Sequence, residues 1–349
     1  MVGAVAASER SAMERALQLA RTPGVPHGPN PRVGCVLLSA DGTVLSEGYH
    51  RGAGTPHAEV DALTGAGDKA RGATAVVTLE PCNHTGRTGP CTEALVAAGI
   101  RRVVYAQADA SPIAAGGADA LRAAGIEVVG GLLADAARAL NPAWTFATEH
   151  RRPFVTWKFA ATLDGRSAAV DGTSRWISSP AARRDTHELR RRCDVVLAGT
   201  GTVLVDDPEL TVRDDADRPL PRDQQPLRAV MGLRTVPADR RVRNTAAETV
   251  VLATREPRDA LRQLFDRGLR HVLLEGGPTL AAAFLTGGYV DEVVAYVAPM
   301  LLGSGLASVG DLGVHTLAGA HRLAVTDVST LGEGADRNVR LTMTIPERG

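Results

Sequence analysis

A histidine, a glutamate and two cysteines stand at spacings that could bind a metal ion and support hydrolysis. His57-Ala58-Glu59 is followed by Cys82 and Cys91, each of which comes directly after a proline. One imidazole and two thiolates can hold Zn²⁺ and leave a fourth position for water, whose pKa the metal lowers from about 15.7 towards about 7. Glu59 need not bind the metal and can carry a proton from that water to a departing amine. The pattern predicts a hydrolytic zinc site.

A closed, structural zinc site is the alternative interpretation of these residues. Such a site uses the same ligand types but needs four of them, and His84 or His50 could supply the fourth. Glu59 would then be a carboxylate beside a cation without a role, which favours the hydrolytic site. Eight residues separate Cys82 from Cys91, whereas two separate the corresponding cysteines in deaminases of nucleic acids and free nucleosides. The spacing of the two cysteines therefore departs from that signature.

Strands that run into helices are expected to position these ligands. Apolar residues at helical spacing predict a helix over residues 8–21, and Asp41-Gly42 between two apolar runs predicts a hairpin. Asn30, in the proline-rich loop before it, could place an amide at the edge of a heterocycle, although a turn-forming asparagine is the simpler interpretation. The α/β alternation predicts a sheet flanked by helices. Strands are expected at 33–38, 44–49, 74–79, 103–106 and 126–129, and helices from 57 onward, at 92–98 and at 118–124.

The length of 349 residues is roughly twice that of a usual domain, so two domains are expected. The alternation breaks near residue 141, and a polar linker over 149–153 divides the chain into domains 1–148 and 149–349. Residues 213–225 are rich in charge and proline and predict a mobile surface loop. In the second domain, strands are expected at 154–160, 195–198, 229–232, 250–253, 271–274 and 293–297.

Two glycine-rich turns follow strands of the second domain, at residues 199–202 and 275–280. Backbone N–H groups in such turns can hold phosphate, although each turn alone is a weak signal and neither is G-x-G-x-x-G. Together they favour a nucleotide cofactor. The arginine-rich run over 183–192 is most simply a solvated helix face, with one or two members binding a substrate phosphate.

Composition argues against several classes of partner. Lys plus Arg equals Asp plus Glu, at 39 each, and aromatic residues make up 3%, so neither charge nor stacking favours a polynucleotide. Cys35 and Cys193 lie in apolar segments, and no disulfide framework is expected. The sequence shows neither a signal-peptide pattern nor an apolar stretch long enough to cross a bilayer. A cytoplasmic protein without a membrane or nucleic-acid partner is expected.

Longer motifs in both halves closely resemble the bifunctional deaminase/reductase family of riboflavin biosynthesis. In the first half these are PNPRVGCV (29–36) and PCNHTGRTGPC (81–91). In the second half they are KFAATLDG (158–165), SRWIS (174–178), GTVLVDDP (201–208) and EGG (275–277). The resemblance extends from about residue 10 to the C-terminus, and both halves occur in the family's order. It implies a cytidine-deaminase-like domain followed by a dihydrofolate-reductase-like domain, both α/β.

By this resemblance, the first half deaminates 2,5-diamino-6-(5-phosphoribosylamino)pyrimidin-4(3H)-one with zinc. The second half then reduces the ribosyl group to ribityl with NADPH. The family pattern places zinc on His57, Cys82 and Cys91 and the proton shuttle on Glu59. It also implies a homo-oligomer. Substrate contacts in the first half fall on Asn30, His50, Arg87 and Asp109.

The same pattern assigns roles in the reductase half, where the protein must hold the nicotinamide against the sugar C1. Lys158 could polarise or protonate the opened ribose; alternatively, it only pairs with a carboxylate. Substrate positions are Ser174, Arg190, Leu210, Arg213 and Glu275, with the two arginines suited to phosphate. Cofactor positions are Ala160, Trp176, Thr202, Asp206, Gly277, Pro278, Thr279, Leu280, Ala281, Ala282 and Ala283.

Three departures from the family pattern affect expected contacts. Ser111 stands where the family has asparagine after Asp109, and Gly89 replaces a proline of the zinc loop. Gly232-Leu233 replaces an aspartate followed by serine or threonine, so one hydrogen bond to NADPH is expected to be missing. Two other functions remain as alternatives: a nucleic-acid deaminase with a binding module, and an active deaminase whose reductase half serves only assembly.

Overall fold

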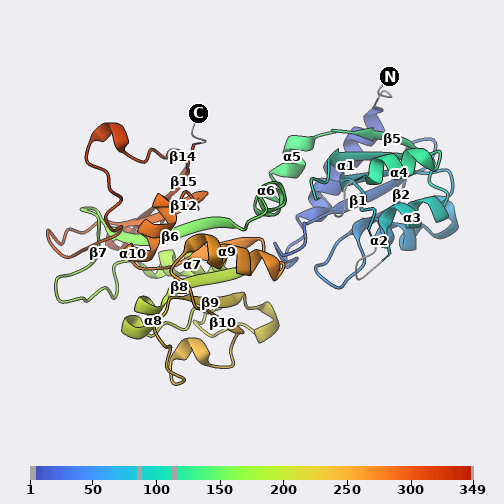
Figure 1. Ribbon diagram of the computed structural model, residues 1–349. Coiled ribbons are helices and arrows are strands. Elements are labelled where there is room, and N and C mark those ends of the chain that lie inside the picture. Colours follow the sequence, from blue (N-terminus) through green and yellow to red (C-terminus); the bar gives the residue numbers. More distant parts are fainter. Residues whose placement is uncertain (1–4, 85–88, 112–115, 347–349) are drawn as a thin grey trace. The chain divides into compact units, whose positions relative to one another are not determined.

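The chain forms two compact units in the computed structural model, Met1–Arg151 and Arg152–Gly349 (Figure 1). The structure describes residues 5–84, 89–111 and 116–346. The division falls three residues after the predicted boundary of 148/149. The predicted linker is wrong for residues 149 and 150, because α6 (Pro142–His150) continues through them. Pro142 lies in the first turn of α6, where its missing N–H costs no helical hydrogen bond.

The N-terminal unit is built on a five-stranded mixed sheet with the order β2-β1-β3-β4-β5. Strands β1 and β2 form the predicted hairpin, β1 pairs antiparallel with β3, and β3, β4 and β5 are parallel. The strands are β1 (Gly34–Leu38), β2 (Val44–Tyr49), β3 (Thr74–Leu79), β4 (Arg102–Gln107) and β5 (Glu127–Gly130). The helices are α1 (Ala7–Ala20), α2 (Ala58–Ala66), α3 (Cys91–Ala97), α4 (Gly117–Ala123) and α5 (Ala134–Arg138), besides α6.

Both faces of this sheet are buried, because successive strand residues point to opposite sides. Cys35 and Leu37 of β1 pack with α2, α3 and α4, whereas Val36 and Leu38 pack with α1 and α5. Gly48 of β2 allows α2 to approach closely, since a Cβ there would lie 2.4 Å from the carbonyl oxygen of Ala58. This approach sets the position of the start of α2, which carries the predicted site.

The C-terminal unit contains an eight-stranded sheet with the order β10-β9-β8-β11-β6-β12-β15-β14. The first six strands in this order, from β10 to β12, are parallel. Strand β15 pairs antiparallel with β12, and β14 pairs antiparallel with β15. The strands are β6 (Phe154–Thr162), β8 (Val195–Gly199), β9 (Leu227–Met231), β10 (Thr249–Leu252), β11 (His271–Leu274), β12 (Glu292–Ala298), β14 (Ala324–Leu331) and β15 (Asn338–Thr344), with β7 (Arg166–Ala168) and β13 (Leu306–Ala307) as a separate pair. The helices are α7 (Pro180–Arg191), α8 (Thr200–Asp206), α9 (Pro257–Asp266) and α10 (Pro278–Thr286).

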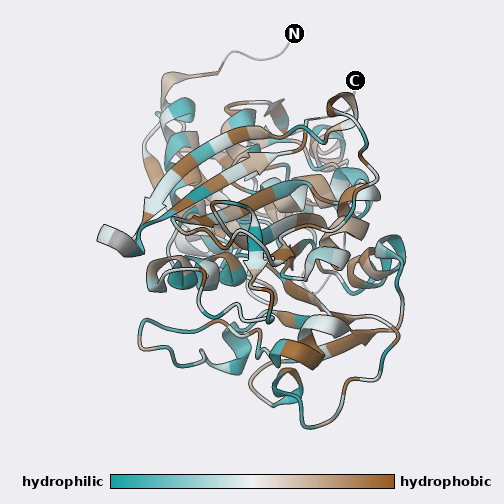
Figure 2. Cartoon of the chain, turned by 90° about the vertical axis from the view of Figure 1, so that its left-hand side faces the viewer, coloured by the Kyte–Doolittle hydropathy of each residue, from teal (hydrophilic) through white to brown (hydrophobic). Residues whose placement is uncertain are grey.

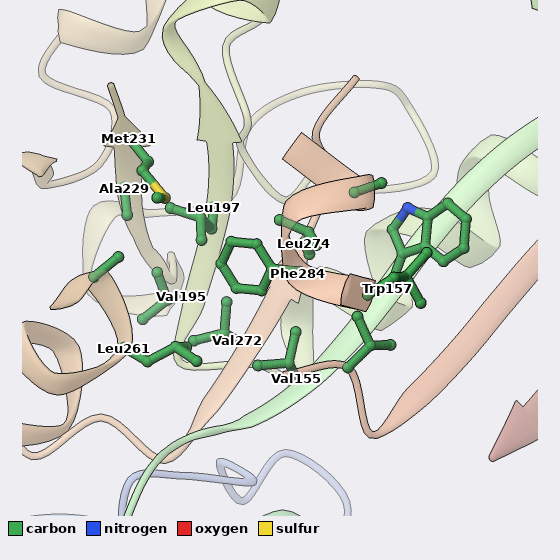
Figure 3. Packing of buried hydrophobic residues seen from close by; sticks show 14 of the residues in the cluster. Val155, Trp157, Val195, Leu197, Ala229, Met231, Leu261, Val272, Leu274 and Phe284 are labelled. Atoms are coloured by element: carbon green, nitrogen blue, oxygen red, sulfur yellow. The ribbon is translucent and has the colours of Figure 1, made fainter. Parts of the chain in front are cut away.

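Alternation along the strands also divides this unit into layers. Figure 2 shows hydrophobic and hydrophilic residues alternating along strands, with hydrophilic residues predominating on loops. Helices α9 and α10 cover the face that carries Val195 and Leu197, and α7 and α8 cover the other face. Phe284 of α10 lies among Val195, Leu197, Val272 and Leu274 in the main core (Figure 3).

The six strands predicted for this unit are all present, with ends that shift by up to two residues. Strands β7, β13, β14 and β15 were not predicted. Most of β14 is exposed, and it carries no continuous apolar run. Residues 213–225 lack regular strands and helices except for one turn, as expected, and an isolated bridge joins Arg213 to Pro219. Within the described ranges, no helix has the length and apolar character needed to cross a membrane.

Candidate active sites

Three predicted metal ligands converge in the N-terminal unit. His57 caps the start of α2, Cys82 follows β3, and Cys91 opens α3. Their ligand atoms lie within 4.8 Å of one another, and Nδ1 of His57 lies 3.2 Å from Sγ of Cys91 and 3.6 Å from Sγ of Cys82. Tetrahedral zinc with usual Zn–N and Zn–S bonds would place nitrogen and sulfur about 3.6 Å apart. The donor set therefore fits zinc in both type and spacing.

Electrostatics at the two thiols supports the same fit. Hydrogen bonding from Cys91 lowers the pKa of Cys82 to about 4, and the same bond raises the pKa of Cys91. The protein alone thus favours one thiolate and one thiol. A divalent cation would bring the second cysteine to its thiolate form and release a proton.

No fourth protein ligand joins the cluster among residues 5–84, 89–111 and 116–346. Both ring nitrogens of His50 are engaged elsewhere: Nδ1 lies 3.0 Å from the carbonyl oxygen of Pro56, and Nε2 lies 3.0 Å from Nδ2 of Asn30. His84 is not part of the group either. This arrangement supports the open hydrolytic site over the closed structural one.

Glu59 lies one residue inside α2 and is 4% exposed. Burial raises its pKa above the ordinary value, and the neighbouring His57 opposes that shift. A carboxylate with a raised pKa both accepts and returns a proton more readily near neutral pH. A raised pKa therefore suits Glu59 to proton transfer.

Asn30 and His50 lie beside the metal cluster, with the His50 and His57 rings 5.3 Å apart between centroids. Because Nδ1 of His50 donates to a carbonyl, Nε2 is left to accept from the amide of Asn30. This bond fixes the amide orientation, so its oxygen remains available to a ligand. Burial lowers the pKa of His50, which favours this neutral form.

Asp109, which follows β4, lies close to the same site. Its N–H donates to Glu80, and its carboxylate accepts from the N–H of Ser111 at 2.8 Å. Burial raises the pKa of Asp109 to about 6, and the charges of Glu80 and Cys82 add to the shift. Ser111 therefore caps Asp109 through its backbone, which does not require the family's asparagine. Arg87 lies outside the described residues, and Gly89 is exposed.

A cavity of about 1130 Å³ opens along the carboxyl edge of the parallel strands in the C-terminal unit. Lys158 and Glu275 line it, together with the glycine-rich turns after β8 and β11. Ligands of open α/β sheets bind at this edge, where strand ends and turns leave a crevice. The two turns lie next to each other because β8 pairs with β11. Such a cavity suits an extended dinucleotide whose phosphates lie against the turns.

Lys158 and Glu275 belong to a charged cluster with Arg190 of α7. Arg190 donates to both carboxylate oxygens of Glu275, at 2.6 and 2.9 Å, and to the carbonyl of Thr211 at 2.6 Å. Burial alone would raise the pKa of Glu275, but Arg190 and Lys158 outweigh it and lower the pKa to about 2. Desolvation lowers the pKa of Lys158. Arg190 is therefore a nearly buried, paired cation, and the prediction of a solvated arginine face is wrong for it.

Replacing Arg190 with methionine should destabilise the reductase unit by about 3 kcal/mol, because it leaves Glu275 nearly buried without its partner. The double variant Arg190→Met/Glu275→Gln should lose less than the sum of the single variants. Since the folded pKa of Glu275 lies below its ordinary value of 4.5, the pair stabilises fully above about pH 4.5 and is lost as the pH falls towards 2. Urea unfolding from pH 3 to 7 checks this. Arg191→Met, at an exposed ion pair, should change stability by less than about 0.5 kcal/mol. Additive losses would contradict the coupling.

Arg213 and Leu210 lie near this cluster but do not line the cavity. Arg213 pairs with Glu209 and donates to the carbonyl of Asp217 at 2.7 Å. Leu210 is 4% exposed and packs in a hydrophobic cluster, so only its backbone is available to a substrate. Glu209 also accepts from Asn244 at 2.6 Å and Arg241 at 3.0 Å. Sequence reasoning missed Glu209, although it lies directly between the DDP motif and Leu210.

Most predicted cofactor positions line the cavity, and three do not. Ala281 and Ala282 are buried in the core. Successive residues of a helix point in different directions, so Leu280 and Ala283 of α10 line the cavity and the two residues between them do not. Trp176 is 64% exposed and packs on the guanidinium of Arg183 at 4.3 Å. Those that line the cavity are Ala160, Thr202, Asp206, Gly277, Pro278, Thr279, Leu280 and Ala283, and Ser174 of the substrate set lies there too.

Comparisons with known proteins agree with this two-part architecture. The cytidine and deoxycytidylate deaminase zinc-binding region matches residues 6–107, and the RibD C-terminal domain matches residues 153–335. Riboflavin biosynthesis protein RibD of Mycobacterium tuberculosis strain H37Rv is 50% identical over 306 residues, covering 87% of this chain and 89% of the relative. RibD of Escherichia coli K12 is 41% identical over 343 residues, covering 89% and 92%.

Solved structures show the same similarity along nearly the whole chain. Acinetobacter baumannii RibD, form 2, has a TM-score of 0.87 at 36% identity and covers 97% of this chain and 98% of its own. A Thermotoga maritima deaminase/reductase has a TM-score of 0.82 at 32% identity, with 97% and 99% covered. These matches confirm the predicted fold classes of both halves. The chain belongs to the RibD family of bifunctional riboflavin biosynthesis proteins, with a zinc-binding deaminase domain followed by an NADPH-dependent reductase domain.

Proposed function

We propose that the N-terminal unit deaminates 2,5-diamino-6-(5-phosphoribosylamino)pyrimidin-4(3H)-one and that the C-terminal unit reduces the ribosyl group of the product to ribityl. The observation that carries the first step is the three-ligand cluster of His57, Cys82 and Cys91 with Glu59 buried beside it. The Thermotoga maritima neighbour is named for deamination of diaminohydroxyphosphoribosylaminopyrimidine and reduction of 5-amino-6-(5-phosphoribosylamino)uracil.

In the deaminase, the chain's own residues orient the ring and move protons. Zn²⁺ on the three ligands supplies the Lewis acidity that makes water reactive at neutral pH. Glu59 takes one proton from the attacking water and passes it to the ring nitrogen beside the reacting carbon. It then carries the remaining hydroxyl proton to the amino nitrogen, so that the C–N bond breaks, ammonia leaves and a carbonyl remains. Asn30, held by His50, and Asp109 contact the polar edge of the pyrimidine. Arg87 is assigned to the substrate by family resemblance.

In the reductase, NADPH supplies hydride, and the protein supplies position and a proton. Lys158 donates a proton to the ribose ring oxygen as the bond from that oxygen to C1′ opens, and C1′ then accepts hydride. The lowered pKa of Lys158 makes its ammonium a better acid. Glu275 and Ser174 contact the sugar. The positive charges of Arg190 and Arg213 offset the negative charge of the substrate phosphate. The glycine-rich turn after β11 holds the cofactor.

The proposed partners are a phosphorylated small molecule and further copies of the chain, with neither nucleic acid nor membrane. All four cysteines, Cys35, Cys82, Cys91 and Cys193, are free, which supports the proposed cytoplasmic location. A homo-oligomer is proposed from the family resemblance. Light scattering on the purified chain measures its mass directly, and a monomer at micromolar concentration would exclude this part.

A coupled assay tests both steps in one experiment. Ammonia release and NADPH oxidation are followed with the diamino substrate and, separately, with the deaminated intermediate, and bound zinc is quantified. One zinc per chain and both activities are expected. Arg213→Ala should release ammonia normally and reduce the intermediate poorly. Ammonia release without NADPH oxidation in the wild type would leave the reductase half a role in assembly only.

A further inference from the structure

Charged residues are distributed unevenly along the reductase cavity. Among the described residues five line it: Lys158, Asp206, Arg234, Arg255 and Glu275. Lys158 and Glu275 lie on β6 and just after β11, where the sugar is proposed to react. Arg234 and Arg255 follow β9 and β10, at the other end of the parallel strand order. Four strand spacings separate β6 from β10, roughly 19 Å at about 4.8 Å each.

The glycine-rich turns occupy the middle of this row. The turn after β8 and the turn after β11 both line the cavity, and in the sheet order both lie between β6 and β9. A dinucleotide with its nicotinamide near Lys158 and its pyrophosphate at the turns would extend its adenosine towards β9 and β10. Arg234 and Arg255 are the positively charged residues that line that end of the cavity.

Neither guanidinium is neutralised by a carboxylate. Arg234 and Arg255 are exposed, and no hydrogen bond or ion pair joins either one to another described residue. Other arginines of this unit pair locally, as Arg190 does with Glu275 and Arg213 with Glu209. Two unpaired cations on one end of a cavity produce a positive potential that attracts an anion.

The backbone before Arg234 favours this arrangement. Gly232 has a φ of +144°, and a Cβ there would lie 2.5 Å from Oγ1 of Thr200, so the chain passes tightly over the turn after β8. The Arg234 side chain returns over that turn, since a Cβ on Gly201 would lie 3.1 Å from its Nη2. Gly232 and Leu233 place no carboxylate after β9. An arginine near the ribose can accommodate a 2′-phosphate.

We propose that Arg234 and Arg255 bind the 2′-phosphate of NADPH and give the reductase its preference for NADPH over NADH. This inference rests on the proposed NADPH-dependent reduction and names residues for the adenosine end of that site. Arginine suits the role because its fixed fork of N–H donors matches the phosphate oxygens. The cofactor differs from NADH only in this phosphate, so selectivity must come from groups that reach it.

Binding of NADP⁺ and NAD⁺ to the full chain by calorimetry tests the proposal. Arg234→Gln and Arg255→Gln should each weaken NADP⁺ binding about tenfold, because each loses a charge-assisted contact. NAD⁺ binding should change by less than about twofold. The fragments 2′,5′-ADP and 5′-ADP should repeat the contrast without the nicotinamide. Arg258→Gln, an exposed arginine on α9 outside the cavity, is the matched control.

The outcomes separate this proposal from the reductase function itself. Equal weakening of NADP⁺ and NAD⁺ would assign the arginines to the pyrophosphate and overturn it, as would unchanged binding of both. If the wild-type protein prefers NADP⁺ and both variants keep that preference, the roles of Arg234 and Arg255 are contradicted, whereas the proposed reduction is not. Wild-type protein that binds neither nucleotide overturns the proposed reduction as well.

Discussion

Glu59→Gln should produce a folded, zinc-loaded protein that no longer releases ammonia at a useful rate. The amide keeps the size of the side chain but cannot accept and return a proton, so deamination should fall about 10²–10⁴-fold. Zinc content should stay at one per chain, because the ligand atoms belong to His57, Cys82 and Cys91. Ammonia release and metal analysis on the same preparation measure both.

Two controls make this result specific. Glu93→Gln, an exposed carboxylate on α3 close to Cys91 in sequence, should retain wild-type deamination. The Glu59→Gln variant should still reduce supplied deaminated intermediate at the wild-type rate, since Glu59 belongs to the N-terminal unit. Loss of zinc in Glu59→Gln would instead make Glu59 a structural support for the metal, and unchanged ammonia release would remove it from the mechanism.

The second large effect is expected at Lys158. Lys158→Met should lower turnover of the intermediate about 10²–10⁴-fold, as expected for the loss of a general acid. Its effect on the dissociation constant of NADP⁺ should be less than about threefold. Lys158→Arg keeps the positive charge but cannot release a proton near neutral pH. Both variants should therefore be slow. Recovery of turnover in Lys158→Arg would show that Lys158 only pairs with the Glu275 carboxylate.

Residue usage supports a titrating role for Lys158. Lys69 and Lys158 are the only lysines among the chain's 39 basic residues, so arginine serves almost everywhere that a fixed positive charge suffices. Lys69 is exposed and provides the control, because Lys69→Met should leave reduction unchanged. Lysine at 158, in surroundings that lower its pKa, can donate its proton and recover it from water.

Local sequence patterns predicted most elements of the two sheets. The Asp41-Gly42 hairpin is present because the N–H of Gly42 closes a turn on the carbonyl of Ser39, and glycine readily adopts the left-handed conformation, φ +86°, that completes the loop. Buried strands such as β3 were predicted to the residue, since their continuous apolar runs have sharp ends. Strand β14 was missed because its residues are mostly exposed and carry no apolar run. The start of the linker was missed because α6 is stabilised by packing, not by a strong local signal.

The sequence by itself predicted the candidate metal ligands, the order of the two domains and the turns that border the cavity, because each depends on residue types at short spacings. Only the tertiary structure decided which side chains share a site. It brings Asn30 and His50 to the zinc ligands and pairs Arg190 with Glu275, 85 residues apart. It also places Arg234 and Arg255 in one cavity although they follow different strands. These contacts depend on strand order and helix packing, which no local pattern encodes.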